Sequence, residues 1–313
     1  MKSPTIGIPS QHGRLAVVTG TGGIGYYAAR ELARAGAEVV MAGRNASKGA
    51  EAVGSIKAEV ENAAVRFEQM DLASLSSVAS FVDRLQRAGQ PVDLLINNAG
   101  IMSPPQRETT ADGFELQFGV NYLGHFALTL GLLPLLRASD ASRVVSVTSL
   151  AHRYSQMDLD DPQNERRYQA GVVYCQSKLA CALFAIELDK RSKAAGWGLQ
   201  SMAAHPGFAA TNLFQNPQGG MSMLNRICTR IVIPLVGQSG HAGAWPIIHA
   251  ATSIEATSGN LYGPRGFMEM SGAPGRCNFA KHAHDPETAA RLWSESEKLT
   301  GLNLTRHALK AMA

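Results

Sequence analysis

Tyr174 and Lys178 stand four residues apart in a segment of helical pattern, Tyr174-Cys175-Gln176-Ser177-Lys178. Side chains at this spacing share one face of a helix, so an ammonium group can lie beside a phenol. A free tyrosine titrates near pH ~10, and using its proton at neutral pH requires lowering the pKa by ~3 units, or ~4 kcal/mol. One positive charge ~4 Å away contributes roughly 4 kcal/mol at an effective dielectric constant of about 20. The pair is therefore suited to proton transfer, although the same spacing also occurs in ordinary solvated pairs on amphipathic helices.

A glycine-rich loop near the start of the chain indicates where a phosphate group binds. The apolar run Leu15 to Thr19 leads into Gly20-Thr21-Gly22-Gly23-Ile24-Gly25, and a helical pattern then continues through Ala35. This order predicts a strand, a turn and a helix whose first N–H groups and dipole stabilise a pyrophosphate. A tight turn without a ligand is the alternative. We expect a dinucleotide to contact Gly20, Gly23, Ile24 and Gly25.

The end of the second predicted strand bears on which dinucleotide is bound. The strand covers Glu38 to Ala42 and is followed by Gly43-Arg44-Asn45, about 20 residues beyond the loop, where a ribose contact is expected. An NAD site places a carboxylate there, whereas an arginine suits the 2′-phosphate of NADP. The missing acid and Arg44 therefore favour NADP. The alternative is that Arg44 and Lys48 belong to a solvated helix start.

Polar groups follow three further predicted strands. Val65 to Met70 precedes Asp71 and Leu72, Val92 to Ile96 precedes Asn97-Asn98-Ala99-Gly100, and Arg143 to Thr148 precedes Ser149. In an open parallel sheet, ligands bind outside the carboxyl ends of the strands. We expect these groups to lie at the same edge as the glycine loop.

Together with Asn121 and the turn His205-Pro206-Gly207, these motifs make the chain resemble the short-chain dehydrogenase/reductase family over roughly residues 14–300. Within the family it looks most like the retinol dehydrogenases and related NADP-dependent carbonyl reductases. That likeness rests on Val145 to His152 (VSVTSLAH), Tyr174 to Ala180 (YCQSKLA) and the wide separation of Ser149 from Tyr174.

The resemblance implies an enzyme that interconverts an alcohol and a carbonyl by hydride transfer to or from a nicotinamide cofactor. It makes Tyr174 the general acid or base and assigns Lys178 to lower the pKa of Tyr174 and hold the nicotinamide ribose. Ser149 would hydrogen-bond the reacting oxygen, and Asn121 would hold a water molecule that links Lys178 to solvent. No metal is needed for this chemistry.

The resemblance also assigns further cofactor contacts: Asp71 and Leu72 near the adenine, Asn98, Ala99 and Gly100 near its ribose, and Pro206, Gly207 and Thr211 at the nicotinamide amide. Each has a structural alternative, since Asp71 can serve as a helix N-terminal residue and the asparagines can fix the backbone between strands. His152 and His205 have no partner at metal-ligand spacing, so we interpret them as structural or substrate-lining residues.

The glycine loop departs from the family pattern. Only Thr21 and Gly22 separate Gly20 from Gly23, one residue fewer than usual. Gly20, Gly22 and Gly25 also satisfy the GxGxxG spacing of the general dinucleotide fold, so phosphate binding need not be lost. The side chain that the family often places in this loop near the adenosine phosphate is absent, which leaves Arg44 as the main candidate for that contact.

Length and composition predict one domain. The chain has 313 residues, of which 45% are hydrophobic, and strand patterns alternate with helical ones without a linker or repeat. We expect an α/β Rossmann-type doubly wound parallel sheet of about seven strands, flanked by helices on both faces. Residues 1–13 form a flexible lead-in and residues 14–313 the domain; its later strands are predicted at Leu199 to Ala204 and Gly259 to Tyr262.

Charge and cysteine content bear on the partners and the cellular compartment of the protein. The 29 basic and 25 acidic residues are spread along the chain, so nucleic acid is not expected as a partner. Cys175, Cys181, Cys228 and Cys277 lack metal-like spacing and favour a reduced, cytoplasmic setting. The longest apolar stretch, Ile231 to Val236, is far shorter than the ~20 residues that cross a bilayer. The family resemblance implies a homodimer or homotetramer formed through the two long helices.

Residues 208–240 combine large apolar side chains with glycines and prolines, which suggests a lid over an apolar substrate. A packed helical insert and a shallow contact with lipid are the alternatives. The sequence thus predicts an NADP-dependent oxidoreductase of a lipophilic small molecule. A reductase of carbon–carbon double bonds and an NADP-binding redox sensor of low turnover are the other possible functions.

Overall fold

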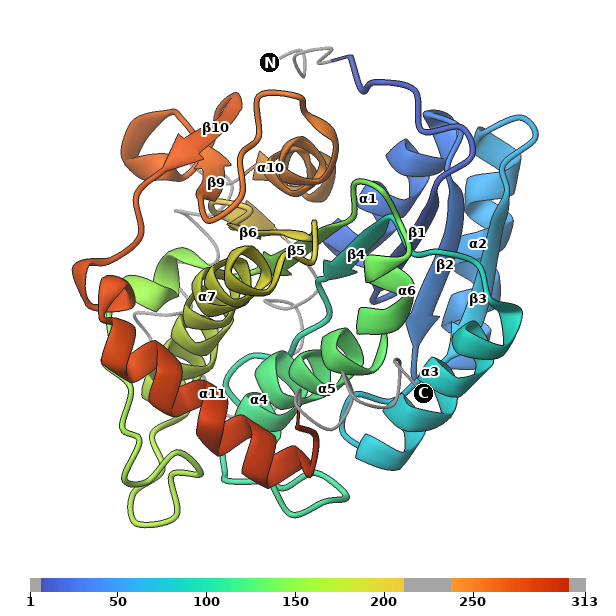
Figure 1. Cartoon of the computed structure of the whole chain (residues 1–313). Coiled ribbons are helices and arrows are strands. Elements are labelled where there is room, and N and C mark those ends of the chain that lie inside the picture. The colour runs from blue at the N-terminus through green and yellow to red at the C-terminus, as the bar shows by residue number, and fades with distance from the viewer. Residues whose placement is uncertain (1–6, 211–237, 304–313) are drawn as a thin grey trace.

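The computed structural model describes residues 7–210 and 238–303, built around one twisted sheet (Figure 1). The strands of the sheet are β1 (Leu15–Thr19), β2 (Glu38–Gly43), β3 (Val65–Gln69), β4 (Leu94–Asn97), β5 (Arg143–Val147), β6 (Gln200–Ala204), β9 (Leu261–Pro264) and β10 (Pro274–Cys277). Their order across the sheet is β10-β9-β6-β5-β4-β1-β2-β3. All neighbouring pairs are parallel except β10, which runs antiparallel to β9. The predicted doubly wound α/β fold is confirmed, and β10 is an additional edge strand that the sequence did not indicate.

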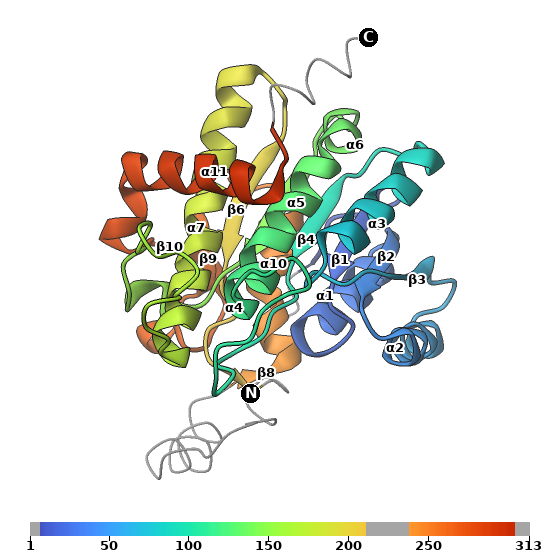
Figure 2. The ribbon, with the colours of Figure 1, turned by 90° about the horizontal axis from the view of Figure 1, so that it is seen from below.

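Helices cover both faces of the sheet (Figures 1 and 2). On one face lie α1 (Gly23–Arg34), α2 (Ala46–Glu59) and α10 (Gly240–Thr252). On the other lie α3 (Leu75–Ala88), α5 (Gly124–Gly131), α7 (Ala170–Ala195) and α11 (Pro286–Thr300). Shorter helical segments are α4 (Leu116–Phe118), the π-helical turn η1 (Gly119–Leu123), α6 (Leu133–Arg137), and the 3₁₀ turns η2 (Leu150–Arg153), η4 (Phe267–Glu269) and η5 (Lys281–His284).

The apolar runs of the central strands explain this layering. In β1, Leu15 and Val17 belong to the core under α3, α5 and α7, while Ala16 and Val18 belong to the core under α1 and α10. Alternate side chains of a strand point to opposite faces, so a strand covered on both sides is apolar throughout. Because these central strands are also parallel, their carboxyl ends lie at the same edge of the sheet.

Strand boundaries differ most from expectation near the end of the sheet. The predicted strand Gly259 to Tyr262 is instead β9, which begins at Leu261 and continues to Pro264. Gly259 has a φ of 79°, a left-handed conformation that does not fit an extended strand, so it belongs to the preceding turn. The shift places Gly263 within the sheet, beside the ring of His205.

The long helix α7 is a core element. It has 26 residues and is long and apolar enough to cross a membrane by length and composition alone. However, 72% of its apolar window is buried inside the domain, and its second and third turns carry Tyr174 and Lys178. Burial among other helices is the ordinary explanation for such a segment in a globular protein.

The helix α11 packs across α7 and closes the core on that face (Figure 1). The ring of Trp293 lies 5.1 Å from that of Phe126 in α5 and 5.7 Å from that of Phe184 in α7. The hydroxyl groups of Tyr122 and Ser296 form a hydrogen bond of 2.7 Å. These contacts support η1 from behind, immediately next to Asn121.

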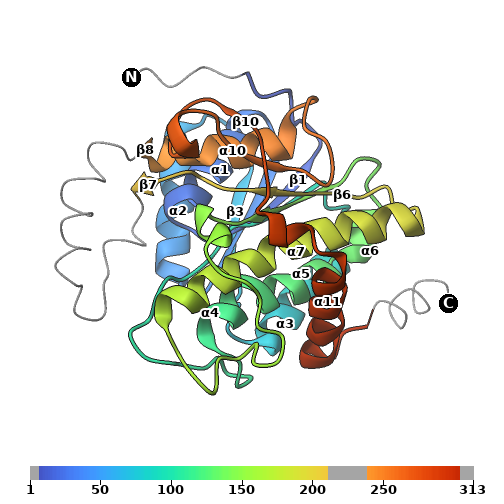
Figure 3. The ribbon, with the colours of Figure 1, turned by 90° about the vertical axis from the view of Figure 1, so that its left-hand side faces the viewer.

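Two segments outside the main sheet complete the description. Gln11 is buried and its backbone N–H donates to the Ala35 carbonyl at 2.8 Å, so the described part of residues 1–13 packs on the domain. The short parallel strands β7 (Ala209–Ala210) and β8 (Gln238–Ser239) pair with each other (Figure 3). Of the predicted lid at 208–240, residues 211–237 lie outside the described residues, and so do Thr211, Cys228 and the apolar stretch 231–236.

Candidate functional site

Ser149 and Tyr174 meet at the carboxyl end of β5. Ser149 follows that strand and starts the turn η2, where its Oγ accepts from Ala151 N at 3.2 Å. Burial raises the pKa of Tyr174 to about 12, and a side-chain hydrogen bond with Ser149 acts in the opposite direction. The shift is opposite to the one expected from the spacing of Tyr174 and Lys178, because loss of solvent around the phenol outweighs the stabilisation of its anion. At pH 7 the Tyr174 phenol is therefore protonated.

Lys178 is held beneath the site rather than at its surface. Its Nζ donates to the Val147 carbonyl at 3.1 Å, and Thr148 Oγ1 donates to the Lys178 carbonyl at 2.7 Å. Burial lowers the pKa of the Lys178 ammonium. Two bonds to the end of β5 thus fix the lysine next to the strand that delivers Ser149.

Asn121 lies in the π-helical turn η1 and connects α7 to the loop after β4. Its Oδ1 accepts from Ile101 N at 2.8 Å, and its Nδ2 donates to the Ile101 carbonyl at 3.0 Å and to Ser177 Oγ at 2.9 Å. A Cβ placed on Gly100 would lie 3.0 Å from Asn121 Oδ1 and 3.4 Å from Lys178 Nζ. The structure thus brings Asn121 and Lys178 together beside Gly100.

The glycine loop has the geometry of a phosphate-binding turn despite its missing residue. Gly23 has a φ of 54°, and a Cβ on Gly25 would lie 2.5 Å from Asn98 Nδ2 and 2.8 Å from the Gly20 carbonyl. Gly22, by contrast, is extended and has open space around it. The positions that need glycine are therefore Gly20, Gly23 and Gly25, and the free N–H groups at the start of α1 remain available for an anion.

A cavity of ≈ 520 Å³ opens outside the carboxyl ends of β1, β2, β3 and β4. Among its lining residues are six of the predicted cofactor contacts: Gly20, Arg44, Asp71, Leu72, Ala99 and Gly100. Gly23, Ile24, Gly25, Asn98, Pro206 and Gly207 are described but do not line it. Gly100, in the wall of the cavity, lies next to Asn121 and Lys178. Ser149, Tyr174 and Lys178 do not line the cavity itself.

Charge at the outer end of this cavity suits a phosphate. Arg44 and Lys48 line it, both are exposed, and within residues 7–210 and 238–303 neither forms an ion pair. Two acidic side chains, Glu108 and Asp71, also line the cavity. The Oδ1 of Asp71 accepts a hydrogen bond from Ala73 N at 2.9 Å. That bond agrees with the alternative role of Asp71 in holding the start of a turn.

Asn98 also has the structural role given above as the alternative to cofactor binding, since it fixes the backbone between neighbouring strands. Its Nδ2 donates to the Thr19 carbonyl at 2.7 Å, and its backbone N–H, with that of Ala99, donates to Thr19 Oγ1 at 2.8 and 2.9 Å. Thr19 also contacts His125 Nε2 at 2.9 Å, and His125 Nδ1 contacts the Asn121 carbonyl at 3.0 Å. Burial lowers the pKa of His125 to about 4, so the ring is neutral at pH 7.

Sequence reasoning missed this chain of contacts from the glycine loop to Asn121. The signal it left unused was Thr19 itself, a buried polar residue at the end of an apolar strand. Ser177 and Thr148 were also passed over, although both lie within the motifs used for the family resemblance.

The two histidines singled out earlier have structural hydrogen bonds. His152 is buried, contacts the Ser149 carbonyl through Nδ1 at 2.6 Å and accepts from Ala280 N through Nε2 at 3.2 Å. His205 accepts from Gly207 N through Nδ1 at 3.2 Å, so its proton is on Nε2, which lies 3.1 Å from Glu269 Oε2.

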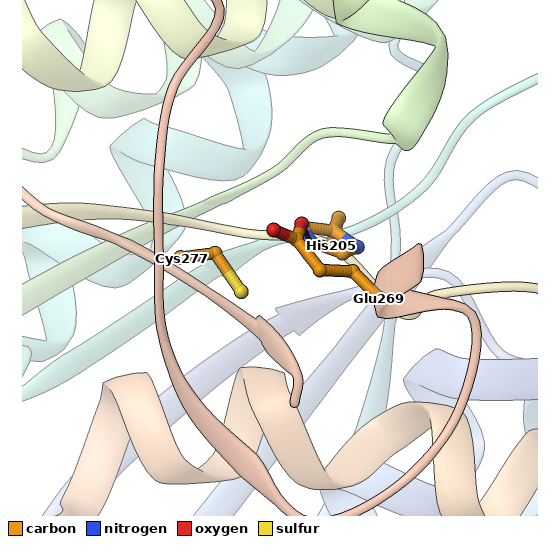
Figure 4. Close-up of side chains that lie close together, drawn as sticks. All are labelled: His205, Glu269 and Cys277. Atoms are coloured by element: carbon orange, nitrogen blue, oxygen red, sulfur yellow. Dashed lines mark hydrogen bonds and ion pairs between the residues drawn. The ribbon is translucent and has the colours of Figure 1, made fainter. Parts of the chain in front are cut away.

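Glu269 and Cys277 gather beside His205, although they are distant from it in sequence (Figure 4). Their donor atoms all lie within 4.8 Å of one another. Arg153 Nη2 lies 2.6 Å from Glu269 Oε2, and burial raises the pKa of the Cys277 thiol to about 12. A metal ion would have to displace both the His205 proton and the arginine, so these contacts describe a hydrogen-bonded cluster.

The family model for short chain dehydrogenases matches residues 14–220. The chain belongs to the short-chain dehydrogenase family. A polyprenol dehydrogenase of Mus musculus is 42% identical over 301 residues, covering 94% of this chain and 86% of that protein. Human retinol dehydrogenase 13 is 40% identical over 294 residues, covering 93% of this chain and 85% of that protein. The predicted likeness to the retinol dehydrogenase branch is confirmed.

Solved structures share the fold of this chain. A protein of Mycobacterium paratuberculosis, described as uncharacterized, superimposes with a TM-score of 0.78 and 38% identity, covering 94% of this chain and 96% of that one. The Pseudomonas aeruginosa RhlG/NADP complex has a TM-score of 0.63 at 24% identity, covering 80% and 94%. Members of this family bind a nicotinamide cofactor, and the cavity beside the glycine loop is the candidate site for it in this short-chain dehydrogenase.

Proposed function

We propose that this short-chain dehydrogenase is an NADP-dependent oxidoreductase that interconverts an alcohol and a carbonyl of a lipophilic substrate. The observation that supports it most directly is the position of Ser149 beside Tyr174 at the end of β5, with Asn121 and Lys178 next to Gly100 in the wall of the cavity. A phenol and a hydroxyl that converge on one point can both bind a substrate oxygen.

The protein's own groups then have distinct roles in the reaction. When bound, the nicotinamide ring supplies or accepts the hydride. Tyr174, neutral at pH 7 because its pKa is raised to about 12, gives its proton to the carbonyl oxygen during reduction. Ser149 Oγ donates a hydrogen bond to the same oxygen. Giving up that proton leaves a phenolate, and the buried Lys178 ammonium stabilises its negative charge. In the reverse direction the Tyr174 phenolate takes the proton from the alcohol and becomes neutral again.

The lipophilic substrate is inferred from the relatives. Their names refer to retinol and to polyprenol, which are long apolar alcohols. We further propose a cytoplasmic setting and a homodimeric or homotetrameric assembly. The described cysteines Cys175, Cys181 and Cys277 are free thiols, which fits a reducing compartment; light scattering of the purified protein would test the assembly.

Replacing Arg44 by Gln should weaken NADPH binding and leave NADH binding nearly unchanged. A charged hydrogen bond to the 2′-phosphate contributes roughly 1.5–3 kcal/mol, so the Kd for NADPH should rise about 10- to 100-fold. NADH lacks that phosphate and has nothing to lose at this position. Fluorescence titration of the purified protein with each dinucleotide measures both constants without requiring a substrate.

Lys57→Gln is the matched control, because Lys57 is also an exposed cation of the α2 region but does not line the cavity. It should leave both constants unchanged. Wild-type protein that prefers NADH, or equal weakening by the two variants, would contradict the role of Arg44.

Turnover requires a separate test with NADPH and a panel of apolar aldehydes and ketones, followed by product analysis. An alcohol as product supports the proposed function. A saturated product with its carbonyl intact would instead indicate reduction of a carbon–carbon double bond, and tight NADPH binding without any turnover would indicate a sensor.

A further inference from the structure

Glu269 joins two segments that border the reacting end of the site. Its Oε2 lies 2.6 Å from Arg153 Nη2 and 3.1 Å from His205 Nε2. Arg153 ends η2, the turn that begins directly after Ser149. His205 follows β6 and starts the turn His205-Pro206-Gly207. One carboxylate therefore ties the carboxyl ends of the neighbouring strands β5 and β6 together.

The backbone around Glu269 is strained. Met268 has a φ of 49° and Glu269 a φ of 57°, and neither is a glycine. A residue held in this left-handed region costs roughly 1–3 kcal/mol, and such conformations persist where surrounding contacts fix them. Here the fixing contacts are the bonds to Arg153 and His205, which also hold the pKa of Glu269 at about 2. The two residues are the centre of a tight turn closed by a hydrogen bond from Met270 N to the Phe267 carbonyl at 3.0 Å, and this turn places the Glu269 side chain against both partners.

The loop that carries Glu269 also packs directly on the turn after β6. The Met270 carbonyl accepts from Phe208 N at 2.8 Å. A Cβ on Gly207 would lie 2.4 Å from that same carbonyl and 2.7 Å from Pro264 Cγ. The position of the turn is thus set by the β9–β10 loop, and the position of that loop is set by Glu269.

The turn at residues 205–207 lies on the side of the sheet where the nicotinamide half of a dinucleotide is expected. The glycine loop follows β1 and Arg44 follows β2, so the phosphate half of a dinucleotide lies over that side of the sheet. Its other half must extend toward β4, β5 and β6, where Ser149 and Tyr174 lie. The turn after β6 therefore borders the nicotinamide half and does not reach the adenine half.

We propose that Glu269 is a positioning residue: by bonding Arg153 and His205 with one carboxylate, it sets the Ser149 segment and the 205–207 turn at the spacing that the nicotinamide half of the cofactor requires. This inference rests on the proposed function, because it assumes a dinucleotide in the cavity.

The test compares two ligands of Glu269→Ala: NADPH, and 2′,5′-ADP, which carries the adenine and its ribose phosphates but no nicotinamide. The variant should weaken NADPH binding about 10-fold and leave 2′,5′-ADP binding unchanged. Glu269→Gln keeps an oxygen that accepts from both partners and should restore NADPH affinity to within about 3-fold of wild type. Asp160→Asn is the control; it removes the exposed ion pair between Asp160 and Arg291 and should change neither constant.

Equal weakening of both ligands by Glu269→Ala would mean a general loss of structure and would overturn the inference, as would unchanged NADPH affinity. Should Glu269→Ala not fold, Arg153→Met takes its place, with the same selective loss expected and unchanged NADPH affinity overturning the proposal. A wild-type protein that binds 2′,5′-ADP but not NADPH or NADH would instead overturn the proposed function, and this inference with it.

Discussion

Tyr174→Phe should lower kcat by about 10²–10⁴-fold while leaving the Kd for NADPH within about 2-fold, because proton transfer by a positioned side chain contributes this much to rate. Phenylalanine keeps the ring and removes the hydroxyl that pairs with Ser149. The two measurements are single-turnover reduction of an accepted carbonyl substrate and fluorescence titration with NADPH.

The matched control is Tyr154→Phe, which removes a hydroxyl close to Ser149 in sequence but on a ring that is 77% exposed. Its turnover should equal that of wild type. Should Tyr174→Phe keep its full rate, Tyr174 is not the proton-transfer group and the mechanism proposed above is wrong.

Thr19→Val should reduce the free energy of unfolding by about 2–6 kcal/mol. Thr19 is fully buried, and its Oγ1 accepts the backbone N–H groups of Asn98 and Ala99. Valine has nearly the same shape but no oxygen, so two donors inside the protein lose their acceptor, at a cost of roughly 1–3 kcal/mol each. Urea denaturation of the variant and the wild type measures the difference.

Thr252→Val separates this effect from the ordinary cost of the substitution. Thr252 is also buried, but its hydroxyl donates to the Ile248 carbonyl within its own helix, so no other group loses an acceptor. Its loss of stability should stay below about 1 kcal/mol. Similar losses in the two variants would show that the bonds from Asn98 and Ala99 to Thr19 are not important for stability.

Local patterns allowed much of the fold and part of the site to be predicted. The strand, turn and helix from Leu15 to Ala35 follow from adjacent residues, and so does the shared face of Tyr174 and Lys178. Because parallel strands end at one edge, the polar groups after β3, β4 and β5 were expected beside the glycine loop that follows β1. Six of the predicted cofactor contacts do line one cavity there.

Features that depend on distant parts of the chain could not be predicted. The direction of the Tyr174 pKa shift depends on burial by other elements, which the spacing of Tyr174 and Lys178 does not reveal. Thr19 meets its partners 79 and 80 positions away, and His205 meets Glu269 64 positions away. No periodicity or motif connects residues at such separations, so these contacts become visible only when the chain is folded.

The packing of α11 against η1 also bears on the order in which the site can form during synthesis. This helix is made after every other element of the described structure, yet its Trp293 and Ser296 support the core directly behind Asn121. A nascent chain can assemble the strands β1 to β6 and the glycine loop before α11 exists. We therefore expect the cofactor cavity to form earlier than a fully supported proton-transfer site, so a chain truncated before Pro286 would retain more of its dinucleotide binding than of its turnover.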